Sequence, residues 1–528
     1  MERIYVRSSC IVINPYSIGE CPDMEKNFRI WNPTTFQYDE LGMFYDNENK
    51  VLYLPRGIDI WKIKRYLHEK SHTKEPSNEY EMIPDIKIKY GPRDEEQVQA
   101  LRFMLGIGEE YEENKYLPQL SLNLSTGKGK TYCSIAMIAY SQIKTAIITG
   151  SVTLLEQWKS EIKHYTNLGD KDVINISGSS MMNMALLGKS KKMKEGSIFL
   201  FTHGTIRSFC DTYGWDKLNE IFKQLGIGIK VIDEAHTNFA NMLMIDFFSN
   251  IAKTYYVTAT PKRSDWREDR IYQLSIKNVP GIDLFDAHQD PHTDYVAIKF
   301  NSKPTAQQIS MCRNMYGLDR NRYVDYVTKQ PNFYKVLHII MDIVIRSNGR
   351  SLFYIGTNKG ILRVYKWLGD NYPEFIGDIG IYTSLIPKEQ KLKEKNKKLL
   401  LSTTKSAGLG EHIEGLKTTI VLAEPFKSEV LARQSLGRTR DNDTIYIELV
   451  DMAFRHIQKF YYSKLQIFNK YAKSTSDTMI DQYELDRRVD RILENRNKLL
   501  GSINPLEFVD KRFFGKEIKE EDLEDSNE

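Results

Sequence analysis

The sequence predicts an α/β protein with two parallel sheets in tandem, a small strand-rich domain before them and a helical extension after them. Short aliphatic runs alternate with helical segments from about residue 97 to 280, and the same alternation returns from about 351 to 447. Buried strands joined by helices are typical of parallel sheets. At roughly 150 residues per domain, a chain of 528 residues has room for three or four domains.

The first ninety residues differ from the rest of the chain. Apolar runs at 11–13 and 51–54 are separated by Pro, Asn, Asp and Gly, which predicts strands joined by turns, and residues 60–67 have a helical pattern. The polar stretch 71–81 lacks apolar periodicity and contains a proline, as a linker would. We therefore expect an accessory domain at residues 1–90.

Aliphatic strands define the two larger domains. We expect the first α/β domain at residues 91–300, the second at 301–455, and a helical extension with an acidic tail at 456–528. The expected strands lie at 146–148, 198–201, 229–232 and 255–257 in the first domain, and at 351–355, 398–402, 419–422 and 444–447 in the second.

Composition excludes several classes of protein. Lys and Arg number 74 against 70 Asp and Glu, a net charge of +4, so any nucleic-acid site must be local rather than a basic coat. Five cysteines without a C-x-x-C pair argue against a disulfide framework or a zinc ribbon. There is no signal-peptide pattern and no run near the roughly 20 apolar residues of a membrane span. We expect a cytoplasmic protein with no membrane partner.

A phosphate-binding loop is predicted where an apolar stretch ends and a helical run, 132–141, begins. Glycines let backbone N–H groups turn toward phosphate oxygens, Lys130 can reach the outer phosphates, and the Thr131 hydroxyl can bind Mg²⁺. Leu124 stands where the strict pattern has its first glycine, and a Gly/Lys-rich surface turn is the alternative. The other residues expected to hold the nucleotide are Thr126, Gly127, Lys128 and Gly129.

A pair of acids follows a second buried strand, about a hundred residues later. The run 229–232 leads into Asp233, Glu234, Ala235 and His236. A carboxylate at such a strand end can hold Mg²⁺, and its neighbour can orient or deprotonate the attacking water. A solvated helix start is the alternative, but the phosphate loop upstream favours a catalytic site. The cofactors we expect are ATP and Mg²⁺.

Together these motifs resemble those of superfamily 2 helicases, over about residues 93 to 450. The resemblance implies two RecA-like domains that bind ATP between them and nucleic acid across them. Residues 124–131 resemble motif I in the variant without its first glycine, 148–158 motif Ia, 201–205 motif Ib, 233–236 motif II of the DEAH form, 258–261 motif III, 402–416 motif V and 434–440 motif VI.

The resemblance also implies nucleotide contacts in the second domain. Gln434 would contact the outer phosphate or the attacking water, and Arg438 and Arg440 would stabilise the charge of the transition state. The family usually has its second arginine one residue later, where this chain has Asp441. Gly410 would contact the nucleotide, although the family's following Ile-Asp is replaced.

Upstream of motif I, residues 93–98 resemble the stretch whose glutamine, here Gln97, reads adenine. A plain solvated helix is the alternative. The resemblance further implies that His236, Thr258 and Thr260 couple the ATP site to the nucleic-acid path. A metal-ligand role for His236 lacks a second His or Cys at ligand spacing.

Residues near motifs Ia, Ib and V are expected to meet the DNA backbone. Gln157 and Trp158 would line the path, or would be core and cap residues of their helix. Thr202, Thr205 and Thr403 would donate to phosphate oxygens, contacts that position a strand without reading its sequence. Helix capping is their alternative role.

Within the superfamily the chain looks most like the UvsW and XPB group, which includes phage and poxvirus helicases. That likeness implies an ATP-dependent DNA helicase or translocase, with 3′ to 5′ polarity, that remodels branched DNA by fork regression, branch migration or unwinding in replication, recombination or repair. The N-terminal domain would engage duplex or junction DNA, and replication or recombination proteins would be partners. A viral member would act in the host cytoplasm.

Three alternatives remain open. A duplex translocase that displaces polymerase or transcripts without unwinding would share every motif. An RNA helicase and a motor subunit of a larger nuclease or replisome assembly are the others.

Overall fold

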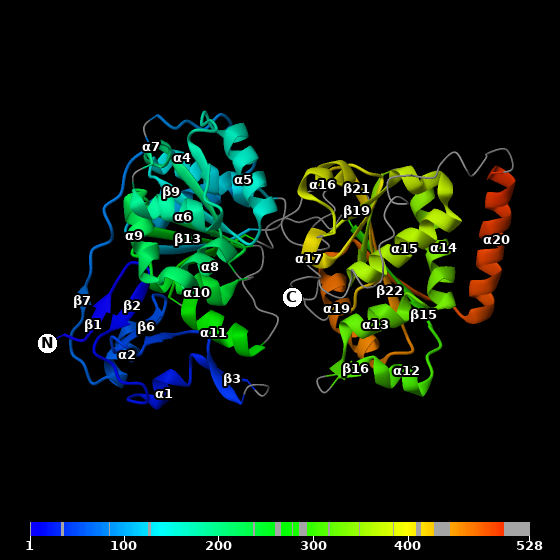
Figure 1. The fold of residues 1–528 in the computed structure, drawn as a ribbon, viewed down its shortest axis with the longest axis horizontal. Helices are drawn as coiled ribbons and strands as arrows, with labels where there is room; N and C mark the ends of the chain where they lie inside the picture. Colours follow the sequence, from blue (N-terminus) through cyan, green and yellow to red (C-terminus); the bar gives the residue numbers. More distant parts are fainter. Residues whose placement is uncertain are drawn as a thin grey trace. The chain divides into compact units, whose positions relative to one another are not determined.

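A computed structural model of the chain forms two compact units, residues 1–288 and 289–528, each of which is described by itself. Figure 1 traces the elements of each unit. The structure describes residues 2–32, 36–83, 85–124, 128–188, 190–235, 238–258, 266–276, 278–284, 293–314, 317–347, 349–383, 385–407, 413–426 and 444–500.

The first unit is built on a parallel sheet. Its described strands have the order β10-β11-β9-β12-β13-β8-β14, and every neighbouring pair is parallel. The strands are β8 (Gln119–Asn123), β9 (Thr145–Thr149), β10 (Val173–Asn175), β11 (Ile198–Thr202), β12 (Ile229–Asp233), β13 (Lys253–Thr258) and β14 (Gly281–Asp283).

Helices cover both faces of this sheet because successive strand residues point to opposite sides. Ile147 and Val231 pack with α3, α4 and α5 on one face. Ile148 and Ile232 pack with α6, α8, α9 and α10 on the other. The helices are α3 (Glu95–Leu105), η1 (Glu109–Lys115), α4 (Lys130–Ser141), α5 (Val152–Tyr165), α6 (Gly178–Leu187), α7 (Lys191–Glu195), α8 (His203–Tyr213), α9 (Asp216–Gln224), α10 (Phe239–Phe247) and α11 (Trp266–Ile276).

The N-terminal region has a sheet of its own, in the order β5-β6-β2-β1-β7, and a small core. It also packs on the first parallel sheet, because Cys10, Val12 and Val51 join the core on the α10 side (Figure 1). Its elements are β1 (Ile4–Val6), β2 (Cys10–Ile13), α1 (Pro22–Glu25), β3 (Arg29–Asn32), β4 (Gln37–Glu40), β5 (Phe44–Asp46), β6 (Val51–Pro55), α2 (Ile60–Tyr66) and β7 (Thr73–Lys74).

A buried polar network joins the N-terminal region to the strands. Lys230 of β12 donates to Asp246 at 2.5 Å, and the Tyr256 hydroxyl donates to the same carboxylate at 2.6 Å. The Gln119 amide donates to the Tyr256 hydroxyl (2.7 Å) and to the backbone oxygen of Ser9 (3.3 Å). All five residues are buried, so the charges are paired away from water.

The second unit is built on a similar parallel sheet. Its described strands have the order β19-β20-β18-β21-β22-β15-β23, again with parallel neighbours. A short antiparallel hairpin, β16 (Arg313–Asn314) and β17 (Gly317–Leu318), lies outside it. The sheet strands are β15 (Thr293–Phe300), β18 (Arg350–Ile355), β19 (Ile379–Tyr382), β20 (Leu399–Ser402), β21 (Leu416–Ala423), β22 (Thr444–Asp451) and β23 (Ser474–Met479).

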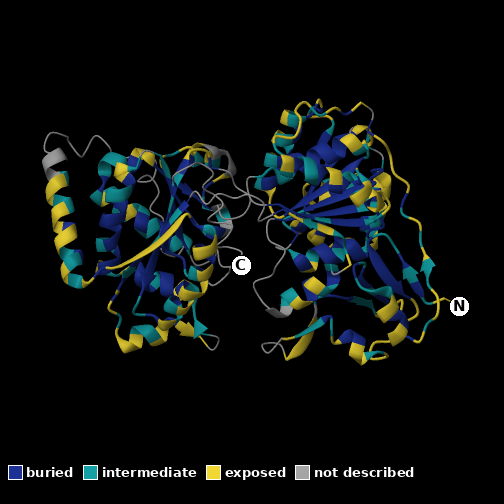
Figure 2. Ribbon diagram, turned by 180° about the vertical axis from the view of Figure 1, so that it is seen from behind, coloured by how far each residue is buried: buried dark blue, intermediate teal, exposed yellow. Residues whose placement is uncertain are grey.

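The helices of the second unit surround this sheet, whose central strands are buried (Figure 2). Strand β23, at one edge of the sheet, is exposed along its whole length. The helices are α12 (Ala306–Met311), α13 (Arg320–Val327), α14 (Pro331–Arg346), α15 (Asn358–Asn371), η2 (Pro373–Asp378), α16 (Lys388–Lys395), α17 (Thr404–Ala407), α19 (Arg455–Tyr471) and α20 (Gln482–Leu500).

The predicted fold class, two RecA-like parallel α/β domains in tandem behind a strand-rich region, is confirmed. Two details differ from expectation. Strand β15, which we assigned to the first α/β domain, pairs with β22 and belongs to the second sheet. The C-terminal extension is not purely helical, because β23 adds a strand beside β15. Across the described ranges, no helix has the length and apolar character that a membrane crossing requires.

Candidate active site

Three strand ends meet at one edge of the first sheet. Strand β13 lies between β8 and β12, with Thr258 in register with Asn123 and Val257 in register with Asp233. Because the strands are parallel, their carboxyl ends share an edge. The segments that resemble motifs I, II and III follow these three ends, so the topology brings them together.

The described part of the phosphate loop, from Lys128 onward, leads directly into α4. Gly129 has φ 92°, a left-handed conformation that favours glycine, and a Cβ there would collide with the Gln97 amide. Helix α4 then begins at Lys130, with no side-chain cap on its first N–H groups. The Lys130 side chain donates to the backbone oxygen of Leu124, just after β8, at 3.1 Å. The loop thus places a lysine and a helix N-terminus together, the arrangement that binds phosphate.

Gln97 braces the loop from α3. Its side-chain oxygen accepts from the Arg93 backbone N–H at 2.8 Å, and its amide donates to the Lys128 backbone oxygen at 3.0 Å. Nearby, Lys128 pairs with Glu96 at 3.1 Å. Gln97 is buried, so the alternative of a plain solvated helix does not describe this residue. Its contacts hold the loop, and adenine recognition stays a prediction.

Asp233 is half-buried at the end of β12 and receives two hydrogen bonds. The indole Nε1–H of Trp158, on α5, donates to Oδ2 at 2.9 Å, and the Glu234 backbone N–H donates to Oδ1 at 3.0 Å. Burial and the negative charge of Glu234 raise the pKa of Asp233 to about 6. The Trp158 hydrogen bond and the positive charge of Lys130 act in the opposite direction. The carboxylate is therefore fixed in orientation and electrostatically suited to a cation.

Backbone contacts tie the three segments to one another. The Leu124 N–H donates to the Thr258 oxygen at 3.1 Å, and the Ala235 N–H donates to the Val257 oxygen at 3.3 Å. Glu234 has φ 49°, an uncommon conformation for a residue other than glycine, and one that occurs at functional sites. Because these hydrogen bonds join the three segments, a displacement of one segment would also displace the other two.

The donors at this edge fit Mg²⁺. Thr131, half-buried in the first turn of α4, offers a hydroxyl, and Asp233 offers a carboxylate. Among the described residues, no group of three or more His, Cys, Asp or Glu could hold a metal by itself. Mg²⁺ in nucleotide sites is held by one or two protein oxygens with phosphates and water, so this donor set suits it. A bound cation would also offset the repulsion between Asp233 and Glu234.

The residues expected to contact DNA divide into buried and capping positions. Trp158 is only 2% exposed, and Gln157 beside it is half-buried, so the core role that we held as an alternative describes Trp158. Thr202 caps α8, accepting from the Thr205 N–H at 3.0 Å. Thr403 caps α17 in the same way, accepting from the Ser406 N–H at 3.1 Å. The capping alternative is thus realised at both threonines, and backbone contacts to DNA stay a prediction.

Sequence reasoning missed Glu424, which follows β21 in the second unit. Its buried carboxylate accepts from the Thr404 backbone N–H at 3.0 Å, from the Thr404 hydroxyl at 2.5 Å, and from Arg320. It therefore fixes the start of α17, in the segment that resembles motif V. An acid at the end of an aliphatic strand is the signal that also identified Asp233, and it could have found Glu424.

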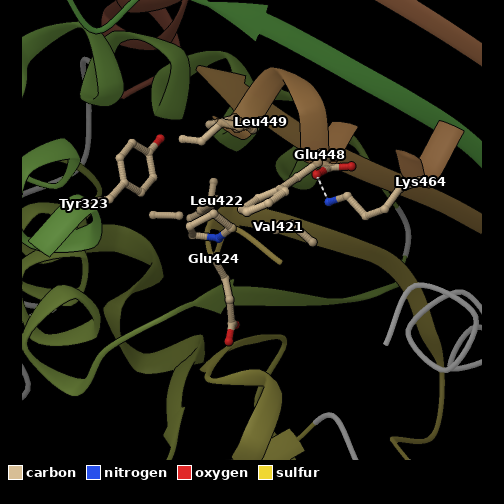
Figure 3. A pocket seen from close by; sticks show the side chains of 11 residues that line it. Tyr323, Val421, Leu422, Glu424, Glu448, Leu449 and Lys464 are labelled. Atoms are coloured by element: carbon tan, nitrogen blue, oxygen red, sulfur yellow. Dashed lines mark hydrogen bonds and ion pairs between the residues drawn. The ribbon is translucent and has the colours of Figure 1, made fainter. Parts of the chain in front are cut away.

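A small pocket in the second unit lies among β21, β22 and α19 (Figure 3). Tyr323, Glu424 and Glu448 line it, and Lys464 forms an ion pair with Glu448. It has room for about one water molecule, so it is too small for a nucleotide. The candidate site is therefore the edge of the first sheet.

Several of the predicted site residues lie outside the described residues. They are Thr126, Gly127, His236, Thr260, Gly410, Gln434, Arg438 and Arg440.

Residues 89–263 match the model of a family described as the type III restriction enzyme, res subunit. This segment holds the phosphate loop and the Asp233–Glu234 pair. This segment is similar to a superfamily 2 helicase-type domain. Curated relatives of the wider chain include poxvirus proteins named transcript termination protein A18. The camelpox virus (strain CMS) protein is 26% identical over 334 residues, 60% of this chain and 62% of its own length. The match thus spans less than two thirds of that relative.

Solved structures of helicase-type proteins are also similar to the chain. T4 UvsW is 13% identical and covers 91% of this chain and 100% of its own, with a TM-score of 0.35. Dbp5 of S. cerevisiae, bound to RNA and ADP BeF3, is 13% identical and covers 76% of this chain and 97% of its own, with a TM-score of 0.47.

Proposed function

We propose that the protein is an ATP-hydrolysing DNA motor, a helicase or translocase that uses Mg²⁺. The observation that supports this most directly is the convergence of Lys130, Asp233 and Glu234 at one sheet edge. Lys130 would bind the outer phosphates, Asp233 and Thr131 would hold Mg²⁺, and Glu234 would orient the attacking water. The bound cation would neutralise charge on the phosphates.

The protein's own groups give each role a physical basis. The Trp158 hydrogen bond keeps the Asp233 carboxylate oriented, and Gln97 keeps the loop backbone in place. In the second unit, Arg438 and Arg440 would stabilise the charge of the transition state, and Gln434 would contact the outer phosphate or the attacking water, so that hydrolysis depends on domain closure. Gly410 would contact the nucleotide, and His236 with Thr258 and Thr260 would relay closure to Thr202, Thr205 and Thr403 on the DNA path.

We further propose that its substrate is branched DNA, with 3′ to 5′ movement, as in the group that the sequence resembles. The test is the steady-state ATPase rate with no nucleic acid, single-stranded DNA, duplex DNA, a four-way junction and RNA at one salt concentration. We expect the strongest stimulation from the junction. Stimulation by RNA alone, or by none of these polymers, would contradict the proposal.

Two variants connect this activity to the candidate site. Lys130→Ala should abolish hydrolysis but keep much of the DNA binding, because phosphate capture and strand contacts use different surfaces. Glu234→Gln should bind ATP and fail to hydrolyse it. Turnover retained in either variant would contradict the site assignment.

A second candidate function is the displacement of transcripts from DNA without strand separation. The name of the poxvirus relatives, transcript termination protein, favours it. A stalled ternary complex of polymerase, template and labelled RNA would distinguish the two. ATP-dependent RNA release without unwinding of a forked duplex would support transcript displacement, whereas junction migration without RNA release would support remodelling. We also propose that the protein acts in the cytoplasm. Its partners would be replication, recombination or transcription proteins.

A further inference from the structure

One end of the second unit gathers positive charge from two distant parts of the sequence. Residues 311–323 and 452–462 together hold five Lys or Arg residues and a single acid, Asp319. That acid caps α13 and lies 3.5 Å from Arg322. The whole chain has a net charge of only +4, so this concentration is a local feature.

Three of these cations are exposed and unpaired. Arg313 lies on strand β16, and Arg455 and Lys459 lie on α19. Within the ranges that the structure describes, none of the three forms an ion pair with an acid. Surface cations usually have acidic neighbours in a chain with nearly equal numbers of both signs, so these charges are free to meet an external anion.

Packing brings the charged segments together. Phe454, the N-cap residue of α19, contacts two rings of α13, with ring centroids 5.0 Å from Tyr323 and 5.6 Å from Tyr326. The first turns of α13 and α19 are therefore neighbours. In Figure 1, the β16 hairpin lies with α12 and α13 at the same end of the second unit.

The hairpin closes onto these two helix starts. Arg322 of α13 donates to the Arg313 backbone oxygen at 3.4 Å. Gly317, with φ 124°, brings the start of β17 against the His456 imidazole of α19, where a Cβ would lie 3.2 Å from Nε2. Arg313 is thus held beside the cations of both helices rather than on a remote loop.

The cations lie where they cost stability. A positive charge in the first turn of a helix opposes the helix dipole. Helix α19 begins with Arg455 and His456, has no acid in its first turn and has no side-chain cap. Helix α13 also begins with Arg320 and Arg322, but there Arg320 pairs with Glu424 and Asp319 caps the helix, so the uncompensated cost lies at α19. Residues that lower the stability of a helix in this way are expected where they serve a function.

We propose that this cationic face, formed by β16 and the first turns of α13 and α19, binds the phosphate backbone of nucleic acid. The positive charge of the face indicates a polyanionic ligand, and the polyanion that an ATP-driven DNA motor binds is the phosphodiester backbone. The inference rests on the proposed function, but it concerns a surface outside the matched segment, residues 89–263, and outside the segments that resemble motifs V and VI.

An aromatic side chain extends the face along α19. Arg455, Lys459 and Tyr462 follow one another at helical spacing, and all three are exposed. Cations interleaved with an exposed ring are typical of surfaces that hold a strand by its backbone and stack a base. The face therefore fits the strand entering or leaving the motor better than it fits a small anion.

The test compares two triple variants of the full chain. The first carries Arg313→Gln, Arg455→Gln and Lys459→Gln. The matched control carries Lys366→Gln, Arg487→Gln and Arg491→Gln, which removes the same numbers of exposed, unpaired Arg and Lys from α15 and α20 of the same unit.

Binding of a labelled DNA duplex is measured by fluorescence anisotropy across a range of salt. Each phosphate contact contributes about 0.9 to the slope of log K against log salt. We expect the first variant to lose about 2 to 3 from this slope and the control to keep it. ATP hydrolysis without DNA should be unchanged in both, because none of these residues belongs to the ATP site.

The outcomes separate this inference from the proposed function. An unchanged slope in the first variant, or an equal loss in the control, would overturn the inference. Loss of binding to poly-L-glutamate with DNA binding intact would show a site for acidic polypeptides and would overturn it as well. A wild-type chain that binds DNA through this face but hydrolyses no ATP would support the inference and contradict the proposed function.

Discussion

Replacing Trp158 by Phe tests whether the buried hydrogen bond to Asp233 serves the reaction. The substitution keeps an aromatic ring in the core but removes the indole N–H that donates to Oδ2 at 2.9 Å. A hydrogen bond to a charged group contributes about 1.5 to 3 kcal/mol, and each 1.4 kcal/mol is about a factor of ten. We therefore expect kcat/KM for ATP to fall about 10- to 100-fold, with a higher Mg²⁺ concentration at half-maximal rate.

The assay is a titration of ATPase rate with Mg²⁺ at saturating DNA. Trp215→Phe is the matched control, because its indole donates to Asp211 at 3.1 Å on the surface, and neither residue belongs to the proposed ATP site. Circular dichroism melts of both variants separate a loss of fold from a loss of chemistry. If Trp158→Phe is folded and has wild-type rates at every Mg²⁺ concentration, the orienting role of the indole is refuted.

Three other substitutions probe the loop, the buried network and a buried histidine. Gln97→Ala should raise KM for ATP more than it lowers kcat, since the Lys128 backbone loses its brace; equal KM values would contradict this. Asp246→Asn should lower the free energy of unfolding by about 3 to 5 kcal/mol by leaving Lys230 unpaired, and Lys230→Met with Asp246→Leu should recover most of it in urea titrations. Burial lowers the pKa of His203 to about 4, from an ordinary value of 6.5. The unfolded chain therefore binds the proton first, and stability should fall from pH 6.5 toward pH 4, by about 2 kcal/mol at pH 5. His203→Leu should remove that pH dependence.

The order of the strands and the place of the candidate site follow from patterns that the sequence displays. Aliphatic runs fix the strands, and the residues just after them, such as Lys130 and Asp233, must meet at the carboxyl edge of a parallel sheet. Side-chain partners are different, because they depend on which helix covers which strand. Trp158 lies on α5, 75 positions before its acceptor, and no local pattern connects the two.

Roles that the residue type leaves undecided have the same origin. A threonine after a buried strand caps the next helix and can also face a ligand, and the residue type alone does not separate the two roles. Thr202 and Thr403 show the capping contact. The domain limit at residue 300 failed for a related reason, since β15 gives no sign in its own sequence of which sheet it joins. Its partner, β22, lies about 150 residues later.

The path from Ser9 through Gln119 and Tyr256 to Lys230 has a consequence for dissecting the protein. Similarity to the family begins at residue 89. However, Lys230, on the strand that ends in Asp233, belongs to a buried polar network that Ser9 helps to complete. A truncated chain starting at residue 89 would open Asp246 and Phe247 to water. The segment that matches the family is therefore smaller than the unit that folds, so the proposed ATPase activity has to be measured on a chain that keeps its leading region.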